Sequence, residues 1–321
     1  MNLESYKNVF LEYLNEKIKI KEPVNLYHPI SYILQIGGKR LRPILCLKAC
    51  ETFSGSYQKA LPASLSIEVF HNFTLLHDDV MDHADIRRGK ETVHKKWNLN
   101  TAILSGDAML ILAYQFLENY TGNRYKEIML IFNKTALQVC EGQQFDVDFE
   151  TREDVKIADY IKMITYKTAV LLASSLQIGA IIGHARVKES DNMYLFGLNL
   201  GIAFQLQDDY LDTFGDANTF GKRIGGDIIE NKKTYLFLKL KEVINSEDAK
   251  LLEMLLSLKD EQEKIDGITA LFVKYDIPEL VLAEIKKYTE IAYKCLEKIN
   301  ISDTLKQEWI QFGEYLMKRI V

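Results

Sequence analysis

The distribution of proline most strongly limits what this chain can fold into. Four of its five prolines lie within the first 62 residues and the fifth is Pro278, so residues 63–277 contain none. Proline inside a helix removes a backbone donor and clashes with the preceding turn. A long proline-free segment in a chain with 47% hydrophobic residues favours helices around a large core. We therefore predict an all-α fold in which residues 1–321 form a single domain, one large helical bundle.

Two copies of an Asp-Asp-x-x-Asp motif interrupt this apolar helical pattern. The carboxylates involved are Asp78, Asp79, Asp82, Asp208, Asp209 and Asp212. In a helix the first and last Asp of each copy lie one turn apart on the same face, where like charges repel. One copy alone would more often be a solvated acidic turn. Two copies, each after an apolar run, favour a site for Mg²⁺ ions that also carry a diphosphate.

Basic residues flank both acidic motifs. The Gly37–Gly38 turn precedes Lys39 and Arg42, and paired glycines let backbone N–H groups approach an anion closely. Such a turn is weak evidence alone and is equally typical of an exposed loop. Arg87 and Arg88 directly follow the first motif, where they either pair with its carboxylates or hold phosphates. We interpret both groups as candidate phosphate ligands.

The second half of the chain adds two further candidate cations. Lys167 lies in an apolar helical stretch, where its ammonium group either reaches out to water or faces a phosphate. Lys222 lies in the glycine-rich segment 213–226 after the second motif, which is typical of a mobile flap. Gln205 shares a helix face with Asp208 and Asp212, because these positions recur at spacings of three and four.

Composition excludes several other classes of protein. A net charge of −5 without a basic stripe argues against nucleic-acid binding. The four cysteines form no CxxC pair, and we expect buried thiols in a reducing compartment. The N-terminus has no signal-peptide pattern and no apolar run reaches about 18 residues, so we expect a cytoplasmic protein without a membrane span. The histidine spacing does not match a zinc site, which leaves the metal to the carboxylates.

The order of these motifs resembles that of the all-trans isoprenyl diphosphate synthase family. The segments that carry the resemblance are GGKRLRP at 37–43, HDDVMDHADIRRG at 77–89, GQQFD at 142–146, YKT at 166–168, QLQDDYLDTFGD at 205–216 and GKRIGGDIIENKKT at 221–234. The resemblance implies an isoprenoid synthase fold with helices around a deep central cavity, usually in a homodimer. It also implies a reaction in which isopentenyl diphosphate adds head to tail to an allylic diphosphate.

The resemblance further implies roles for individual residues. The direct ligands of three Mg²⁺ ions would be Asp78, Asp82 and Asp208. The carboxylates that lie behind them or bind through water would be Asp79, Asp209 and Asp212. The cations around the allylic diphosphate would be Lys167, Lys222, Arg87 and Lys232. The isopentenyl diphosphate site would comprise Lys39, Arg42, His71 and Arg88. The oxygens that face the allylic cation would belong to Thr168 and Gln205, with Gln143 and Asp146 as a supporting polar pair.

Product length should depend on the helix before Asp78. Thr74, one turn earlier, is small and leaves a channel open, whereas Phe73 is rotated by about 140° from Asp78 and by geometry alone is a side wall or a core residue. In the family, farnesyl-type members tend to carry aromatic residues at both positions or a two-residue insertion in the motif. This chain has neither. We therefore expect a geranylgeranyl product, with a farnesyl product as the alternative.

Two other interpretations fit less well. A class I terpene cyclase shares the first acidic motif, but it typically has a different second metal motif and needs no site for a second diphosphate. A non-catalytic subunit of a heteromeric prenyltransferase usually lacks an Asp of one motif. Both motifs are complete here, so we favour an active short-chain prenyltransferase.

Overall fold

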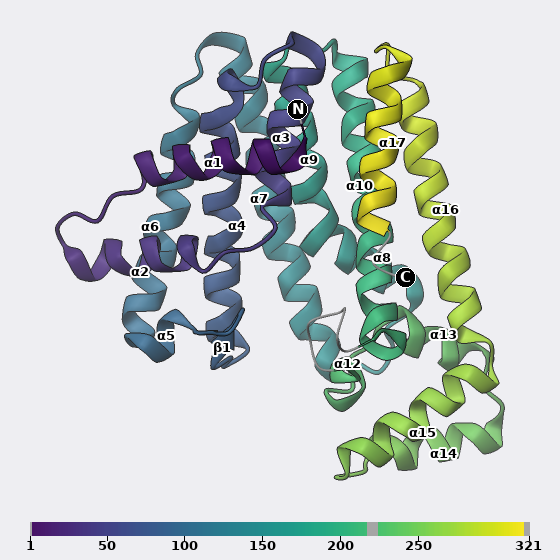
Figure 1. Ribbon diagram of the computed structural model, residues 1–321. Helices are drawn as coiled ribbons and strands as arrows, with labels where there is room; N and C mark the ends of the chain where they lie inside the picture. Colours follow the sequence, from purple (N-terminus) through teal and green to yellow (C-terminus); the bar gives the residue numbers. More distant parts are fainter. Residues whose placement is uncertain (1, 217–223, 318–321) are drawn as a thin grey trace. The chain divides into compact units, whose positions relative to one another are not determined.

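The computed structural model describes residues 2–216 and 224–317, which are predominantly helical (Figure 1). The helices are α1 Leu3–Lys17, α2 Val24–Gln35, α3 Leu41–Ser54, α4 Leu61–Met81, α5 Val93–Lys96, α6 Leu99–Leu117, α7 Gly122–Thr151, α8 Ile157–Ile164, α9 Val170–Ile182, α10 Val187–Phe214, α12 Gly226–Ile229, α13 Tyr235–Val243, α14 Ser246–Leu256, α15 Glu261–Lys274, α16 Ile277–Glu297 and α17 Asp303–Met317. The remaining elements are the helical turns η1 Gln58–Ala60 and η2 Thr165–Ala169 and the strands β1 Ile86–Arg87 and β2 Lys90–Glu91. The prediction of an all-α fold is confirmed.

The prolines lie mostly where a helix tolerates them. Pro62 and Pro278 stand in the first turns of α4 and α16, where the missing N–H has no helical partner to lose. Pro29 is the exception, since it lies inside α2. A proline inside a segment argues against a helix there, and we therefore did not predict α2 from the sequence. The long helices α7, of 30 residues, and α10, of 28, both lie in the proline-free segment.

The described residues form two compact units. Unit 1 comprises the described residues up to Asn133 together with Ser174–Asp191, and unit 2 comprises Lys134–Ala173 together with the described residues from Asn192 onward. The boundaries fall within α7, α9 and α10, so each unit combines segments from distant parts of the chain. That residues 1–321 form a single domain stays a prediction.

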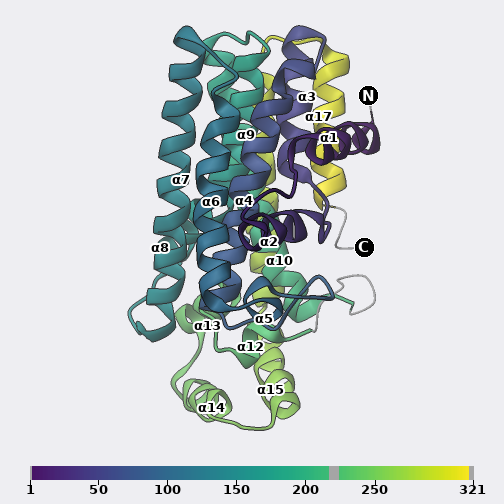
Figure 2. The same cartoon turned by 90° about the vertical axis from the view of Figure 1, so that its left-hand side faces the viewer.

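Unit 1 is built around α4. This helix is buried on nearly every side, because its residues from Ala63 to Phe70 are all closed to solvent. It runs side by side with α6, as Figures 1 and 2 show. The buried Ser66 hydroxyl donates to the carbonyl of Ala113 on α6 at 2.6 Å, so the close packing leaves this polar group satisfied. The first acidic motif, at the end of α4, therefore stands on a rigid support.

Unit 2 holds the second acidic motif on the last turns of α10. Leu206 of that helix is fully buried in a core shared with α8, α13, α15 and α16. Further along the chain, the buried Trp309 of α17 packs edge-on against Phe196 of α10, with ring centroids 5.9 Å apart. These contacts fix the rotation of α10 about its axis and so the face on which its aspartates lie.

The cysteine prediction was partly wrong. Cys46, Cys50 and Cys295 are buried free thiols, as expected, but Cys140 is exposed. Cys140 lies on α7 next to the exposed Glu141 and so belongs to the solvent face of an amphipathic helix. Sequence analysis treated the four thiols alike and did not separate the two faces.

Among the described residues, one helical stretch has the length and hydropathy of a candidate membrane span. It covers Ile157–Ile182, and 67% of its most apolar window is buried inside the structure. Burial of this extent is typical of a core helix.

Candidate active site

The middle carboxylate of the first acidic motif is held by an arginine. Asp79 is only 2% exposed, and its two oxygens accept hydrogen bonds from Arg87 Nε at 2.8 and 2.9 Å. A second nitrogen of the same guanidinium lies 2.7 Å from Asp79. Forked pairs of this kind fix both partners. Of the other two carboxylates, Asp78 is half-buried and Asp82 is exposed, so they remain accessible from outside the protein.

A small hairpin directly after the motif carries both arginines. Strands β1 and β2 pair antiparallel, with Ile86 opposite Glu91. The two residues of the turn, Arg88 and Gly89, have φ values of 51° and 73°, which is the geometry of a type I′ turn. Sequence analysis missed this hairpin, because strands of two residues leave no alternating pattern.

The hairpin brings Arg88 against the glycine turn before α3. The Arg88 guanidinium donates to the carbonyl of Gly37, and a Cβ at Gly38 would lie 2.5 Å from one of its nitrogens. Gly38 also has a φ of 126°, which side chains rarely adopt. The paired glycines therefore allow a cation to pack directly on the backbone. Lys39, the next residue, is exposed.

The same part of unit 1 brings Arg42 and His71 together. Arg42 Nη1 lies 3.1 Å from His71 Nε2. Burial lowers the pKa of His71 well below its usual value, and the positive charges of Arg42 and Arg88 lower it further. His71 is thus neutral, and its Nε2 accepts a hydrogen bond from Arg42. Burial also lowers the pKa of Arg42 to about 10. A bound anion would relieve this crowding of positive charge.

An unsatisfied donor supports an anion at this position. The buried Arg42 Nε has no hydrogen-bond partner in the part of the chain that the structure describes. A buried N–H group without a partner is rare and costs about 1–3 kcal/mol. The cluster of Arg42, His71, Arg88 and the Gly37–Gly38 turn, here called the anion site, thus suits a phosphate group.

A buried ion pair anchors the anion site. Arg40 donates to Glu68 of α4 and to the carbonyl of Leu34, and the two charged side chains are 2% and 4% exposed. Asn72 donates to the same Glu68 oxygen at 3.1 Å. These bonds tie the start of α3 to α4. Sequence analysis gave no role to Arg40 or Glu68, because the partners lie 28 residues apart and no spacing rule relates them.

In unit 2 the middle carboxylate of the second motif is also held by protein donors. Asp209 is 6% exposed, and one of its oxygens accepts from the Tyr160 hydroxyl. The other accepts from Gln205 Nε2 at 3.0 Å, while Gln205 Oε1 accepts from the Thr168 hydroxyl at 3.2 Å. Burial, together with the negative charge of Asp227, raises the pKa of Asp209 to about 8. Positive charge nearby would favour the ionised form.

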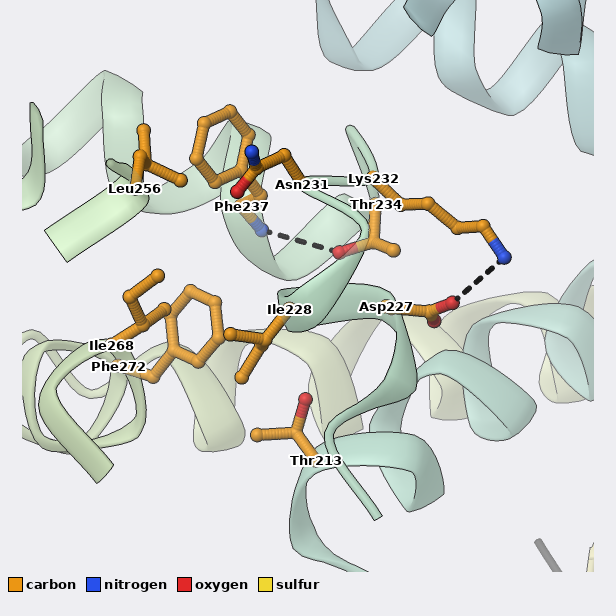
Figure 3. A pocket seen from close by; sticks show the side chains of 10 residues that line it. All are labelled: Thr213, Asp227, Ile228, Asn231, Lys232, Thr234, Phe237, Leu256, Ile268 and Phe272. Carbon is orange, nitrogen blue, oxygen red and sulfur yellow. Dashed lines mark hydrogen bonds and ion pairs between the residues drawn. The ribbon is translucent and has the colours of Figure 1, made fainter. Parts of the chain in front are cut away.

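The last carboxylate of this motif contacts the segment that contains Lys232. Asp212 accepts from the backbone N–H of Asp227 at 3.0 Å, and Lys232 Nζ lies 3.4 Å from the Asp227 carboxylate. Although burial alone would lower the pKa of Lys232, Asp227 and a neighbouring glutamate raise it. Figure 3 shows Lys232 reaching toward Asp227 beside a small pocket, with Ile268 and Phe272 on its apolar side.

Lys167 and Thr168 lie on η2, a single π-helical turn between α8 and α9. Such turns are rare and are found frequently at functional sites. Lys167 Nζ lies 2.5 Å from Asp146 of α7, and both side chains are about one-third exposed (31% and 35%). Helix α7 approaches η2 closely, since a Cβ at Gly142 would overlap the backbone nitrogen of Lys167. The GQQFD and YKT segments are therefore direct neighbours.

The donors in both units fit Mg²⁺. Carboxylates are the oxygen ligands that this hard cation prefers, and it commonly takes one or two of them with substrate phosphates. Burial and the charge of Asp227 raise the pKa of Asp209, and a cation beside the second motif would favour its ionised form. The buried Gln143 Oε1 has no hydrogen-bond partner among residues 2–216 and 224–317 and could accept from a water. Within these same residues, no group of three or more His, Cys, Asp and Glu side chains forms a ready-made metal site.

The predicted site residues divide between the two units. Unit 1 holds Lys39, Arg42, His71, Asp78, Asp79, Asp82, Arg87 and Arg88. Unit 2 holds Gln143, Asp146, Lys167, Thr168, Gln205, Asp208, Asp209, Asp212 and Lys232. Lys222 lies outside the described residues.

Sequence analysis missed Tyr160. As an aromatic residue on an apolar helix face it looked like an ordinary core residue, and its partner Asp209 is 49 residues away.

Comparisons with known proteins identify relatives over the whole chain. A family model for polyprenyl synthetase matches residues 23–272. A crystal structure of a geranylgeranyl pyrophosphate synthase is 48% identical, with a TM-score of 0.95 and full coverage of both chains (100% of each). A geranylgeranyl diphosphate synthase from Sulfolobus acidocaldarius is 37% identical over 95% of this chain and 92% of its own. A geranylfarnesyl diphosphate synthase from Natronomonas pharaonis is 37% identical over 74% of each chain.

Proposed function

This chain belongs to the polyprenyl synthetase family of prenyltransferases, and from that premise we propose that it makes geranylgeranyl diphosphate. Isopentenyl diphosphate would add head to tail to dimethylallyl, geranyl and then farnesyl diphosphate. The observation that carries this proposal is the anion site of unit 1. There His71 is neutral, and the buried Arg42 Nε has no hydrogen-bond partner among the described residues, so it can donate to a phosphate. Lys167 and Lys232 are cations outside this anion site, which leaves them to bind a second diphosphate.

The proposed roles of the basic residues follow from their surroundings. The anion site and Lys39 bind the diphosphate of isopentenyl diphosphate, and the short contact of Arg88 with Gly37 holds its guanidinium at this place. Lys167, Lys222, Lys232 and Arg87 bind the allylic diphosphate. Fixed positive charge stabilises the negative charge that develops as the allylic C–O bond breaks. The proton lost after the new bond forms passes to the departed diphosphate.

Enzymes of this family use Mg²⁺, and we propose three ions in this chain, held by Asp78, Asp82 and Asp208. When bound, Mg²⁺ neutralises the diphosphate and makes it a better leaving group. Arg87 keeps Asp79 in place behind the first motif, and the Asp227 backbone keeps Asp212 in place behind the second. Gln143 and Asp146 support this region from α7, Asp146 through its ion pair with Lys167.

Thr168 and Gln205 are proposed to face the allylic cation. Their side chains touch, with the Thr168 hydroxyl 3.2 Å from Gln205 Oε1. Oxygen lone pairs next to a carbocation stabilise its positive charge, and exclusion of water prevents its capture as an alcohol.

The limit on product length is proposed to be Phe73. Its ring is 9% exposed and packs against Phe70 and His77, with centroids 5.7 and 4.8 Å away, while Thr74 beside it is half-buried. A tail growing along α4 would meet this aromatic cluster. We expect it to stop the product at twenty carbons, with the fifteen-carbon farnesyl product as the alternative. Because one relative is named a geranylfarnesyl synthase, the product must be measured.

The test is to incubate the pure enzyme with Mg²⁺, isopentenyl diphosphate and each allylic primer, and to size the dephosphorylated alcohols. Geranylgeraniol is the expected main product, and Phe73→Ala should lengthen it because the tail then gains the space of the ring. Phe10→Ala, which removes a fully buried phenylalanine from α1, controls for loss of packing and should leave product length unchanged. A Phe73→Ala product of unchanged length would place the limit elsewhere.

The same assay separates the alternatives. A cyclic hydrocarbon formed without isopentenyl diphosphate would indicate a terpene cyclase, and no product under any condition would indicate a non-catalytic subunit.

We also propose a homodimer. Leu104 and Ile111 of α6 are 60% and 57% exposed although both are large and apolar, and they lie two turns apart on one face. Leu130 of α7 is 71% exposed. Large apolar residues exposed together on one face favour an interaction surface, and a second copy of this chain is the occupant we propose. A cytoplasmic location stays a prediction from the sequence.

A further inference from the structure

Four polar side chains of unit 2 form a continuous series of hydrogen bonds. The Tyr160 hydroxyl donates to Asp209 Oδ2, and Gln205 Nε2 donates to Asp209 Oδ1 at 3.0 Å. The Thr168 hydroxyl then donates to Gln205 Oε1 at 3.2 Å. Tyr160 and Asp209 are almost completely buried, at 2% and 6% exposure. These residues, here called the polar relay, connect the core of unit 2 with the two residues proposed to face the allylic cation.

The direction of each bond in the polar relay follows from the chemistry of the groups. Both oxygens of Asp209 accept, Oδ2 from Tyr160 and Oδ1 from Gln205, so the amide nitrogen of Gln205 faces Asp209 and its oxygen faces Thr168. If the Gln205 amide were flipped, its oxygen would face the Asp209 oxygen. Its nitrogen, a donor, would then face the Thr168 hydroxyl. Asp209 therefore decides which end of the Gln205 amide points to Thr168. The two residues are one helical turn apart on α10, so the pairing is built into the helix.

Tyr160 in turn decides how the Asp209 carboxylate is rotated. It reaches Asp209 from α8, and its ring packs edge-on against Tyr235 of α13, with centroids 6.4 Å apart. An aromatic ring fixed in this way has little freedom, so its hydroxyl is a stationary donor. With one oxygen bound to Tyr160, the carboxylate can present only the other to Gln205.

We propose that Tyr160 and Asp209 are positioning residues for prenyl transfer. They orient the Gln205 amide so that the Thr168 hydroxyl donates a hydrogen bond to Gln205 and turns its oxygen lone pairs to the allylic cation. This inference rests on the proposed function, from which it takes the roles of Thr168 and Gln205. It also gives Asp209 a task that differs from that of Asp208. The middle Asp of the second motif orients an amide, whereas its neighbour binds metal.

The first test compares Tyr160→Phe with Tyr235→Phe, a matched control that removes a hydroxyl from the neighbouring ring outside the polar relay. Tyr160→Phe should lower kcat about tenfold, the equivalent of one net hydrogen bond. Because substrate binding is not involved, KM for both substrates should stay within about twofold. Asp209→Asn should lower kcat at least as much, because an amide at this position can donate and so permits Gln205 to turn. Neither change should alter the Mg²⁺ concentration that gives half-maximal rate.

The second test asks whether Tyr160 acts through Gln205. In a Gln205→Ala background the polar relay has no amide to orient, so Tyr160→Phe should cause no further loss of kcat. The same fold loss in both backgrounds would overturn the inference, as would a wild-type kcat for Tyr160→Phe or a higher Mg²⁺ requirement for Asp209→Asn. An inactive wild-type enzyme would overturn the proposed function as well, whereas an active enzyme that is insensitive to Tyr160→Phe overturns the polar relay alone.

Discussion

At the scale of single residues, the ion pair of Arg40 and Glu68 shows how a charge can serve a binding site without touching a ligand. Both side chains are closed to solvent. Removing one partner of such a pair leaves the other charge buried and uncompensated, which typically costs about 3–5 kcal/mol. Arg40 also has a φ of 53°, just before α3, which is the left-handed region that residues with side chains rarely adopt. The ion pair helps to keep the backbone in this conformation.

We expect Arg40→Met to lower the free energy of unfolding by about 3–5 kcal/mol, measured by calorimetry or denaturant titration. The double variant Arg40→Met/Glu68→Leu should lose clearly less, because no unpaired charge then remains. Lys287→Met, which breaks the ion pair of Lys287 (58% exposed) with Glu284, is the control and should change stability by less than about 1 kcal/mol. Equal effects of Arg40→Met and Lys287→Met would contradict the structural role.

Sequence analysis found the charged residues of the site more readily than the residues that hold them. Asp78, Arg88 and Lys167 lie in short motifs that, taken together, favour phosphate and metal chemistry. Tyr160 and Glu68 carry no such signal, because each acts through a partner that is distant in sequence and buried with it. Without its partner, an aromatic residue on a core helix is interpreted as a packing residue and an acidic one as a surface residue.

At the scale of secondary-structure elements, the close approach of α7 to η2 depends on Gly142. Helix propensity alone predicts that Gly142→Ala stabilises the protein by about 1 kcal/mol. The contact predicts the opposite, because the new Cβ would lie 2.2 Å from the backbone nitrogen of Lys167, and backbone cannot move aside as a side chain can. Overpacking of this kind costs about 1–3 kcal/mol.

We therefore expect Gly142→Ala to lower both the melting temperature and kcat, since the displaced η2 carries Lys167 and Thr168. Glu141→Ala is the control on the same helix, at an exposed position. It should leave both quantities nearly unchanged. A Gly142→Ala protein that is more stable and fully active would show that helix propensity outweighs the contact.

Elements with strong signals were predicted and those with weak ones were not. The helix predicted before Asp78 agrees with α4, because Pro62 marks its start and the apolar pattern is continuous. The β1–β2 hairpin and η2 were missed, since two-residue strands have no periodicity and a π-helical turn differs from an α-helical one by a single residue. Both contain residues of the candidate site, so the irregular backbone segments are also the ones that carry site residues.

At the scale of the whole molecule, the exposed apolar residues of α6 and α7 predict self-association. Ile111→Glu combined with Leu130→Glu should convert a dimer to a monomer in sedimentation experiments, because two buried charges without partners would oppose the interface. Met254→Glu, at a residue of α14 that is 58% exposed, is the matched control and should remain dimeric. A wild-type protein that is monomeric at micromolar concentration, or a double variant that still dimerises, would contradict the proposed surface.

The π-helical turn at Thr165–Ala169 also has a consequence for insertions and deletions. Such a turn holds one residue more than the α-helix needs. Deleting Tyr166 should therefore yield a regular α-helix, and we expect the variant to fold. The deletion would nevertheless rotate Thr168 by about 100° relative to Tyr160 and so separate the two ends of the polar relay. At this position, we expect insertions and deletions to leave the fold intact and to abolish catalytic activity.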